Sequence, residues 1–309
     1  MPVCVINQPG GLGDIIWIQP IVDHMIDRGY EVVYPVKGVY YEMISRSIRK
    51  DGLRWVPETG EYPMKELFFI LDSDNIKHDP SIRLLAGINE GKTRLDQTKN
   101  IKINDLIGLM RSRKFTQIQG SMSSQFMQRI RPSITTTKLG EDLYLSLQYS
   151  DLHLPSCPVM ISKYYLMGLP ITNWHNNLTI KRNSQREDRV FDVYGIDRNS
   201  PYSLMNLTYG TPPNLNKTRK MDIKSRNEQR VLMSIEIDGE NDICLFDWLG
   251  VIENADEIHS VETAFCYLAD KYSRTPHMTM HEKRQQNEPN VYYRLTSLVY
   301  RNPNWTYYG

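Results

Sequence analysis

The stretch VCVINQPGGLGDIIWIQP, residues 3–20, decides the fold of this chain. Residues 3–6 form a short apolar run rich in β-branched side chains, which predicts a strand buried on both faces. From Ile15 to Ile26 apolar residues recur at spacings of three and four, which predicts a helix that ends at Arg28 and Gly29. The stretch is therefore expected to form a strand, a glycine turn and a helix.

The turn contains Gly10, Gly11 and Gly13. Glycine can adopt positive φ, and it lets another molecule approach the backbone closely. Asp14 falls at the predicted start of the helix, where free backbone N–H groups stabilise a carboxylate. The spacing is neither Gly-x-Gly-x-x-Gly nor a Walker loop. It is compatible both with a simple helix cap and with a ligand site at the carboxyl edge of a sheet.

Length and composition narrow the class of protein. The 309 residues are enough for two domains, and 37 Lys and Arg against 36 Asp and Glu give a net charge of +1, so we expect no nucleic-acid partner. The four cysteines are scattered without metal-ligand spacing, which is typical of reduced core thiols. The first residues show no basic region followed by a long apolar stretch, so we expect no signal sequence, and no run approaches the roughly 20 apolar residues of a membrane span. We expect a cytoplasmic protein without a transmembrane segment.

The α/β pattern occurs in both halves of the chain. Residues 30–36 predict a second strand, which completes a β-α-β unit with the opening stretch. After a helix predicted within residues 182–195, the pattern restarts at residue 201. We therefore expect two Rossmann-like domains, over residues 1–182 and 183–309. Other expected elements are helices over 40–49, 246–254 and 263–272, strands over 53–56, 67–71, 144–147, 230–235 and 257–261, and a helix with an aromatic cover within 291–309.

The second half offers a group of candidate anion ligands at the carboxyl ends of its strands. A basic turn follows the strand that begins at residue 201, and a helix N-terminus follows the strand over 257–261. Lysine, arginine and helix N-termini suit a diphosphate, although a solvated loop and an ordinary helix-terminal charge explain the same pattern. His259 is compatible with a ligand or with core packing. The candidates are Gly210, Lys217, Arg219, Lys220, Glu262 and Thr263.

Two segments resemble a known family. Residues 11–20, GLGDIIWIQP, resemble the opening motif of the heptosyltransferase-like glycosyltransferases (glycosyltransferase family 9), which have the GT-B fold. Residues 252–256, IENAD, together with 261–269, VETAFCYLA, are similar to the donor-site segment of that family, in the same order. The chain has Glu262, Ala264 and Tyr267 where the family has Asp, Gly and His. The resemblance leaves roughly residues 40–200 uncovered.

The resemblance implies a GT-B-like arrangement, with an acceptor-side domain over 1–182 and a donor domain over 183–309 facing each other across a cleft. It implies an inverting, metal-independent glycosyltransferase that moves a sugar from a nucleotide-activated donor to a glycan or glycolipid acceptor, with Asp14 as general base. It implies no cofactor, and the three glycines of the turn would let the acceptor or the sugar come close to the backbone. Together with the strand-end candidates, the predicted donor-binding residues are Gly210, Lys217, Arg219, Lys220, His259, Glu262, Thr263 and Tyr267.

Two other functions remain open. Asp72 and Asp74 follow the predicted strand over 67–71, and this Asp-x-Asp resembles the metal-diphosphate site of GT-A glycosyltransferases, where both carboxylates would bind Mn²⁺ or Mg²⁺. The chain is also compatible with a non-catalytic, GT-B-shaped binding protein, because a fold alone does not imply turnover. A nicotinamide-dependent oxidoreductase fits less well, because the spaced glycines and the acidic residue of the second strand are missing.

Overall fold

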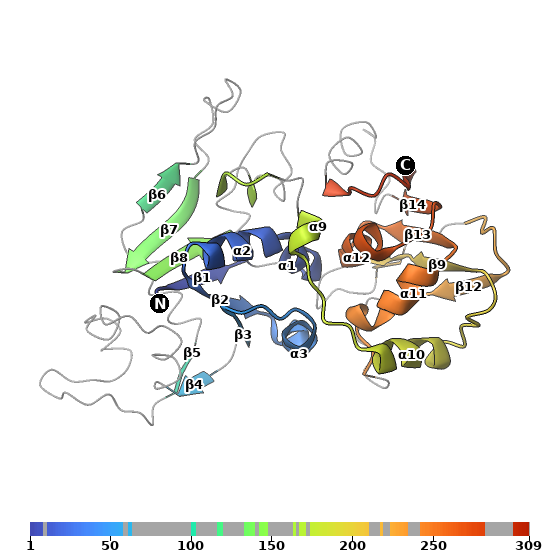
Figure 1. Ribbon diagram of the computed structural model, residues 1–309, viewed down its shortest axis with the longest axis horizontal. Helices are drawn as coiled ribbons and strands as arrows, with labels where there is room; N and C mark the ends of the chain where they lie inside the picture. The colour runs from blue at the N-terminus through green and yellow to red at the C-terminus, as the bar shows by residue number, and fades with distance from the viewer. Residues whose placement is uncertain are drawn as a thin grey trace, which may run out of the picture. The chain divides into compact units, whose positions relative to one another are not determined.

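The computed structural model describes residues 1–8, 11–57, 61–63, 100–102, 116–119, 133–139, 142–147, 163–164, 167–170, 174–209, 217–218, 223–233, 242–281 and 299–308 (Figure 1). The chain forms two compact units, Met1–Pro9 with Ile18–Asn173 and Gly10–Trp17 with Trp174–Gly309. The domain boundary after residue 182 stays a prediction, since a division by contacts does not define domains that fold alone. The predicted strand over 67–71 lies outside the described residues.

The first unit contains a six-stranded sheet in the order β3-β2-β1-β8-β7-β6. Strands β3, β2, β1 and β8 run parallel to one another, whereas β7 is antiparallel to both of its neighbours. A separate antiparallel pair joins β4 to β5. The strands are β1 (Val3–Asn7), β2 (Glu31–Val36), β3 (Leu53–Pro57), β4 (Glu61–Pro63), β5 (Asn100–Lys102), β6 (Thr116–Gln119), β7 (Ser133–Leu139) and β8 (Asp142–Ser146); the helices are α2 (Gln19–Asp27) and α3 (Gly38–Ser47).

The strand β1 lies inside this sheet, between β2 and β8. The side chains of Val3, Cys4, Val5 and Ile6 are at most 1% exposed, so the prediction of a strand buried on both faces is confirmed. Burial raises the pKa of the Cys4 thiol. The expected β-α-β order is also confirmed, because β2 pairs in parallel with β1.

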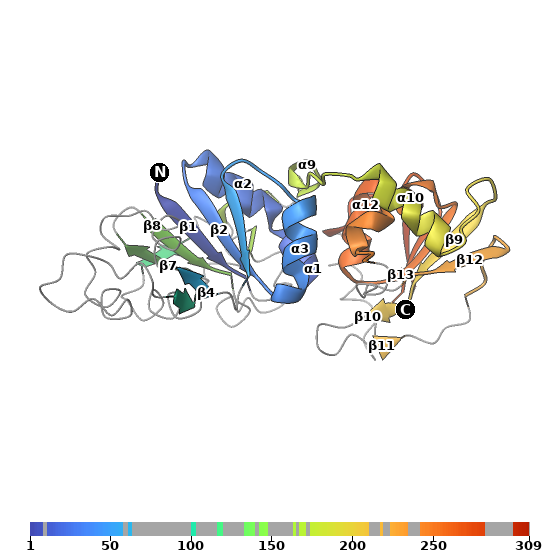
Figure 2. The ribbon, with the colours of Figure 1, turned by 90° about the horizontal axis from the view of Figure 1, so that it is seen from below.

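The second unit contains a parallel five-stranded sheet in the order β12-β9-β13-β14-β15. Figure 2 shows α10 and α12 on the same face of this sheet. The elements are α1 (Leu12–Trp17), α9 (Trp174–Asn177), α10 (Ser184–Val193), β9 (Tyr202–Asn206), β10 (Thr208–Tyr209), β11 (Lys217–Thr218), β12 (Gln229–Leu232), η4 (Leu245–Trp248), α11 (Leu249–Asn254), β13 (Glu257–Val261), α12 (Ala264–Tyr272), β14 (Met278–His281) and β15 (Trp305–Tyr308).

The prediction of one continuous helix after the glycine turn is wrong. The segment forms two helices that meet at Ile18, and Pro20 lies in the first turn of α2. Proline has no N–H group to donate to the preceding turn, which explains why the helix cannot continue through it. The two helices also belong to different units, because α1 clusters with the second unit and α2 with the first.

The C-terminal tail ends in a strand that the sequence did not predict. Residues 305–308 form the edge strand β15, in which Trp305 pairs with Met278 and Tyr307 with Met280, while residues 291–298 of the predicted helix lie outside the described residues. The open edge of β14 supplies backbone hydrogen-bonding groups that an added strand satisfies. The aromatic cover is confirmed for Trp305, which is 7% exposed.

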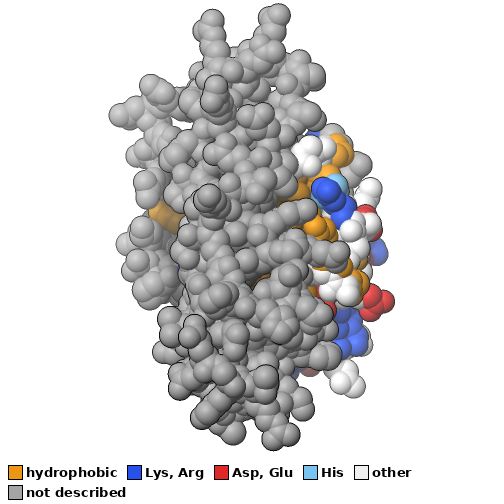
Figure 3. All heavy atoms as spheres, turned by 90° about the vertical axis from the view of Figure 1, so that its left-hand side faces the viewer, with side chains coloured by type: hydrophobic (Ala, Val, Ile, Leu, Met, Phe, Trp, Pro, Cys, Tyr) orange, Lys and Arg blue, Asp and Glu red, His pale blue; other side chains and the backbone are white. Residues whose placement is uncertain are grey.

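The part of the surface that is coloured in Figure 3 has no simple charge pattern. In the view of Figure 3, Lys and Arg side chains are interspersed with Asp, Glu and hydrophobic side chains where side chains are coloured. None of the helices within the described ranges is both long and apolar enough to cross a membrane.

Candidate functional site

Polar side chains at the carboxyl edge of the second sheet form hydrogen bonds with one another. β9 ends at Asn206, whose amide nitrogen donates to Ser260 Oγ at 3.0 Å and to Thr263 Oγ1 at 2.8 Å. Asn206 is fully buried, and within the described part of the chain its Oδ1 has no hydrogen-bond partner. A buried acceptor without a partner is unfavourable, so a donor from a ligand would be stabilising here.

The N-terminus of α12 starts at this same point. Thr263 is the N-cap residue in an extended conformation, but its side chain makes no capping hydrogen bond, and its Oγ1 accepts from Asn206 instead. Its carbonyl oxygen accepts from the Cys266 N–H at 3.0 Å. Since the side chain does not cap the helix, the first turn of this nine-residue helix offers backbone donors and a positive dipole end to an anion.

Asp14 lies in the first turn of α1, two residues after the helix begins. Its Oδ2 accepts from the Gly11 N–H at 3.1 Å, and its own N–H donates to the Gly11 carbonyl oxygen at 3.1 Å. The side chain is 8% exposed. Asp14 therefore caps α1 from the third helical position rather than from the N-cap position itself.

The two helix starts lie against each other through Gly13. A Cβ atom at this glycine would lie 3.2 Å from Tyr267 Cε2 and 3.6 Å from the Cα of Ala264. The missing side chain thus allows α1 to approach the first two turns of α12 closely. Gly13 does not use the positive φ that glycine allows, because it lies inside the right-handed helix α1.

Tyr267 is surrounded by aromatic rings. Its ring centroid lies 5.8 Å from Trp17, 5.3 Å from Trp174 and 5.3 Å from Tyr300. The side chain is 5% exposed. Burial raises the pKa of Tyr300 well above its usual value, with Tyr267 and Glu262 adding to the effect. The donor-binding roles of Tyr267 and Glu262 stay predictions, but the ring of Tyr267 already packs within the protein.

His259 lies inside the second sheet, on β13. Its Nε2 is 3.1 Å from Glu257 Oε1, and its Nδ1 is 3.3 Å from His281 Nε2. Burial lowers the pKa of His259, and the Glu257 carboxylate partly opposes this shift. Both ring nitrogens of His259 thus lie close to polar groups of the protein itself. The donor-binding role of His259 stays a prediction.

The predicted basic turn, over residues 216–220, comes after β9 and β10 in the chain. β10 pairs with β11 in an antiparallel hairpin that sets Tyr209 opposite Lys217, so the backbone of Lys217 lies close to the end of β9. Gly10, Gly210, Arg219 and Lys220 lie outside the described residues.

Sequence reasoning missed Asn206 and Ser260. Both are polar residues at or near the carboxyl ends of buried strands. A polar residue at such a position in the sequence could have indicated a ligand site. Among the described residues, no three His, Cys, Asp or Glu side chains are grouped so that they could hold a metal ion. Asp72 and Asp74 fall in the part of the chain that the structure does not describe.

The described sheets define an α/β protein with two Rossmann-like units. No family model matches the chain, and no curated protein sequence matches it. Among solved structures, the chain is similar to a glycosyl transferase of family 9 from Veillonella parvula, with a TM-score of 0.43, 9% identity, and coverage of 91% of this chain and 80% of that one.

Two structures from E. coli are similar at the same level. One is the ADP-heptose LPS heptosyltransferase II, with a TM-score of 0.44, 12% identity, and coverage of 100% of this chain and 90% of that one. The other is the heptosyltransferase WaaC with ADP, with a TM-score of 0.38, 8% identity, and coverage of 99% and 92%. At these scores the fold class rests on the two sheets of the chain itself.

Proposed function

We propose that this protein is a glycosyltransferase of the GT-B class, which moves a sugar from a nucleotide-activated donor to a hydroxyl group of a glycan or glycolipid. The proposal includes inversion at the anomeric carbon, no requirement for a metal or cofactor, and a cytoplasmic location. The near-neutral charge supports a small-molecule donor rather than a nucleic-acid partner.

One observation carries the proposal. The two segments that resemble the family lie at opposite ends of the sequence, and yet Gly13 of the first contacts Ala264 and Tyr267 of the second. A chance match of two short motifs would have no reason to produce this contact. Asp14 follows Gly13 in α1, and α12 begins at the carboxyl edge of the second sheet, where open α/β sheets bind their ligands.

The proposed roles follow from the chemistry of sugar transfer. Asp14 removes the proton from the acceptor hydroxyl as that oxygen attacks the anomeric carbon. The departing nucleoside diphosphate is stabilised by the N–H groups at the start of α12 and by Lys217, Arg219 and Lys220. The amide of Asn206 holds the Thr263 hydroxyl away from the helix cap, which leaves those N–H groups open to the diphosphate.

The test is a donor panel with the full chain. UDP-, GDP- and ADP-sugars are screened by thermal shift, and each is then assayed for hydrolysis and for transfer, with and without EDTA. We expect at least one nucleotide to raise the melting temperature, and its sugar to turn over at an unchanged rate in EDTA. If no nucleotide shifts the melting temperature, the donor site is refuted. Turnover that EDTA abolishes would favour a metal mechanism through Asp72 and Asp74.

A second candidate function is a binding protein without turnover. The packing of Tyr267 favours it, because this residue stands where the family has a histidine and its ring is enclosed by Trp17, Trp174 and Tyr300. A nucleotide that stabilises the protein, combined with neither hydrolysis nor transfer of any donor, would select this candidate over the enzyme.

A further inference from the structure

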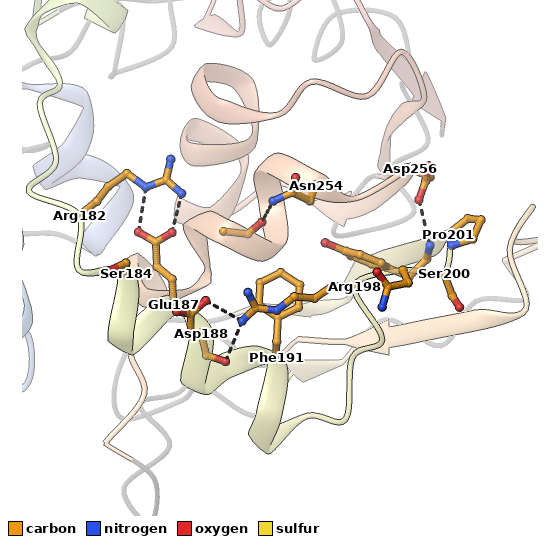
Figure 4. Close-up of a pocket in the computed structure, with 13 residues that line it drawn as sticks. Arg182, Ser184, Glu187, Asp188, Phe191, Arg198, Ser200, Pro201, Asn254 and Asp256 are labelled. Atoms are coloured by element: carbon orange, nitrogen blue, oxygen red, sulfur yellow. Dashed lines mark hydrogen bonds and ion pairs between the residues drawn. The ribbon is translucent and has the colours of Figure 1, made fainter.

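A cavity of about 570 Å³ lies at the amino edge of the second sheet, where β9 and β13 begin (Figure 4). Its walls come from α10, from the turn before β9, and from α11 together with Asp256, which lies two residues after the end of α11. The five residues of β9, at roughly 3.3 Å per residue, separate this edge from the carboxyl edge by about 13 Å. The cavity is therefore distinct from the candidate transfer site, and its volume falls in the range of small-molecule sites.

The cationic side chains of the cavity are already neutralised. Arg182 forms a bidentate pair with Glu187, with 2.8 Å between Nε and Oε1, and Arg198 pairs with Asp188 at 2.6 Å. Figure 4 shows both guanidinium groups turned toward these carboxylates. Because neither arginine presents an uncompensated charge, the cavity does not suit a phosphate or another anion.

The inner wall of the cavity is apolar and well supported. Phe191 and Tyr202 are 5% and 2% exposed, and their rings meet edge to face with 6.5 Å between centroids. The guanidinium group of Arg198 lies 4.2 Å from the centroid of Phe191. At Gly250 a Cβ atom would lie 3.0 Å from Glu187 Oε2, so α10 and α11 approach each other closely there. The wall is thus fixed before any ligand binds.

The polar rim offers mainly acceptors. Asn254 donates its amide N–H to the Gly250 carbonyl at 2.8 Å, and Asp256 Oδ2 accepts from the Tyr202 N–H at 3.0 Å. Asn254 Oδ1, Asp256 Oδ1 and the hydroxyl group of Ser184 make no hydrogen bond to the described residues. These groups come from three elements and do not converge on one point, which suits several hydroxyl donors spread around a ligand better than one cation.

From this geometry we infer that the amino-edge cavity, lined by Ser184, Phe191, Arg198, Tyr202, Asn254 and Asp256, binds a neutral saccharide unit. The sugar would lie against the flat guanidinium group with which Arg198 covers the Phe191 ring, and its hydroxyl groups would meet the rim acceptors. It brings no charge that the paired arginines would have to meet. The inference goes beyond the proposed transfer reaction and does not depend on it.

The test is saturation-transfer NMR on the full chain without nucleotide. The probes are the methyl glycosides of glucose, galactose, mannose and N-acetylglucosamine, with putrescine and inorganic phosphate as charged competitors. The test variant combines Ser184→Ala with Asp256→Asn, which keeps the size of both side chains and the bond to the Tyr202 N–H. Asp192→Asn, on the exposed side of α10 and outside the cavity, is the matched control.

We expect at least one glycoside to bind the wild type and the Asp192→Asn variant equally, and to bind the double variant at least 10-fold more weakly. A third variant, Asp14→Asn, should bind like the wild type, which separates this cavity from the transfer site. The inference is overturned if no glycoside gives a signal, if the double variant, folded by circular dichroism, binds as the wild type does, or if putrescine or phosphate displaces the glycoside. Since the readout is binding alone, a failure of the proposed transfer activity would not change the result.

Discussion

The two edges of the second sheet are built by different physical means. At the carboxyl edge, buried groups bind one another and the helices touch directly, as in the bonds of Asn206 and the contact of Gly13 with Tyr267. At the amino edge, partly exposed ion pairs such as Arg198 with Asp188 surround an open cavity. Removing a buried ring from a packed interior costs several kcal/mol, whereas an exposed ion pair contributes little. Substitutions at the first edge should therefore affect folding, and substitutions at the second should affect mainly binding.

The largest effect is expected for Tyr267→Ala, at the carboxyl edge. The substitution removes a ring that contacts Trp17, Trp174 and Tyr300, and it should lower the free energy of unfolding by about 3–5 kcal/mol. Urea denaturation measures this change. Tyr267→Phe keeps the ring and serves as the control, with a loss of less than half of that of the alanine variant. An alanine variant as stable as the wild type would show that the aromatic cluster does not hold α12 in place.

A smaller loss is expected for Gly13→Val. The new side chain would overlap Tyr267 and should destabilise the chain by about 1–3 kcal/mol. Gly11→Ser is the matched control, because nothing lies within 4 Å of a Cβ atom at Gly11 and serine is a good N-cap residue. In a double-mutant cycle, the effect of Gly13→Val should shrink when Tyr267 is already alanine. Additive losses would mean that α1 and α12 do not pack as described.

A pH effect is expected from His259. Because burial lowers its pKa in the folded chain below the ordinary value of 6.5, the unfolded chain takes up the proton first as the pH falls. The stability that depends on neutral His259 is thus present above about pH 7 and is lost as the pH falls through 6.5 toward the folded pKa. Melting temperatures between pH 8 and pH 5 should fall more steeply for the wild type than for His259→Gln. Parallel curves for the two proteins would contradict this assignment.

The smallest effect is expected at the amino edge, for Arg198→Ala. The side chains of Arg198 and Asp188 are 48% and 55% exposed, so the loss of their ion pair and of the contact with Phe191 should cost about 1 kcal/mol or less. Chemical denaturation of Arg198→Ala beside Tyr267→Ala compares the two edges directly. An equal loss of unfolding free energy in the two variants would contradict the proposed difference between the two edges.

The parts of the fold that follow from local pattern could be predicted. β13 spans residues 257–261 and α12 begins one residue after its predicted start, because buried strands and amphipathic helices leave clear periodic signals. The break at Ile18 was missed although Pro20 gave a usable signal. Strand β15 could not be predicted, since its partner is the edge of β14, which the local sequence of the tail does not encode.

The candidate site was predictable only as a set of residue types. Asp14 and Thr263 were identified from helix starts, but their environments depend on tertiary contacts that no single segment specifies. The reason for a glycine at position 13 lies in Tyr267, at the other end of the sequence. The hydrogen bonds of Asn206 likewise join two strands that are distant in the chain. The amino-edge cavity left no motif at all, because its walls come from three separate elements.

The central claim is that Asp14 acts on the acceptor beside a donor bound at the start of α12. The most direct measurement compares donor turnover by the wild type and by Asp14→Asn, together with the Kd of the corresponding nucleoside diphosphate. We predict that turnover falls by about 10²–10⁴-fold, as expected for the loss of a general base, while the Kd changes by less than about twofold. Turnover by Asp14→Asn at the rate of the wild type, with the same Kd, would contradict the claim.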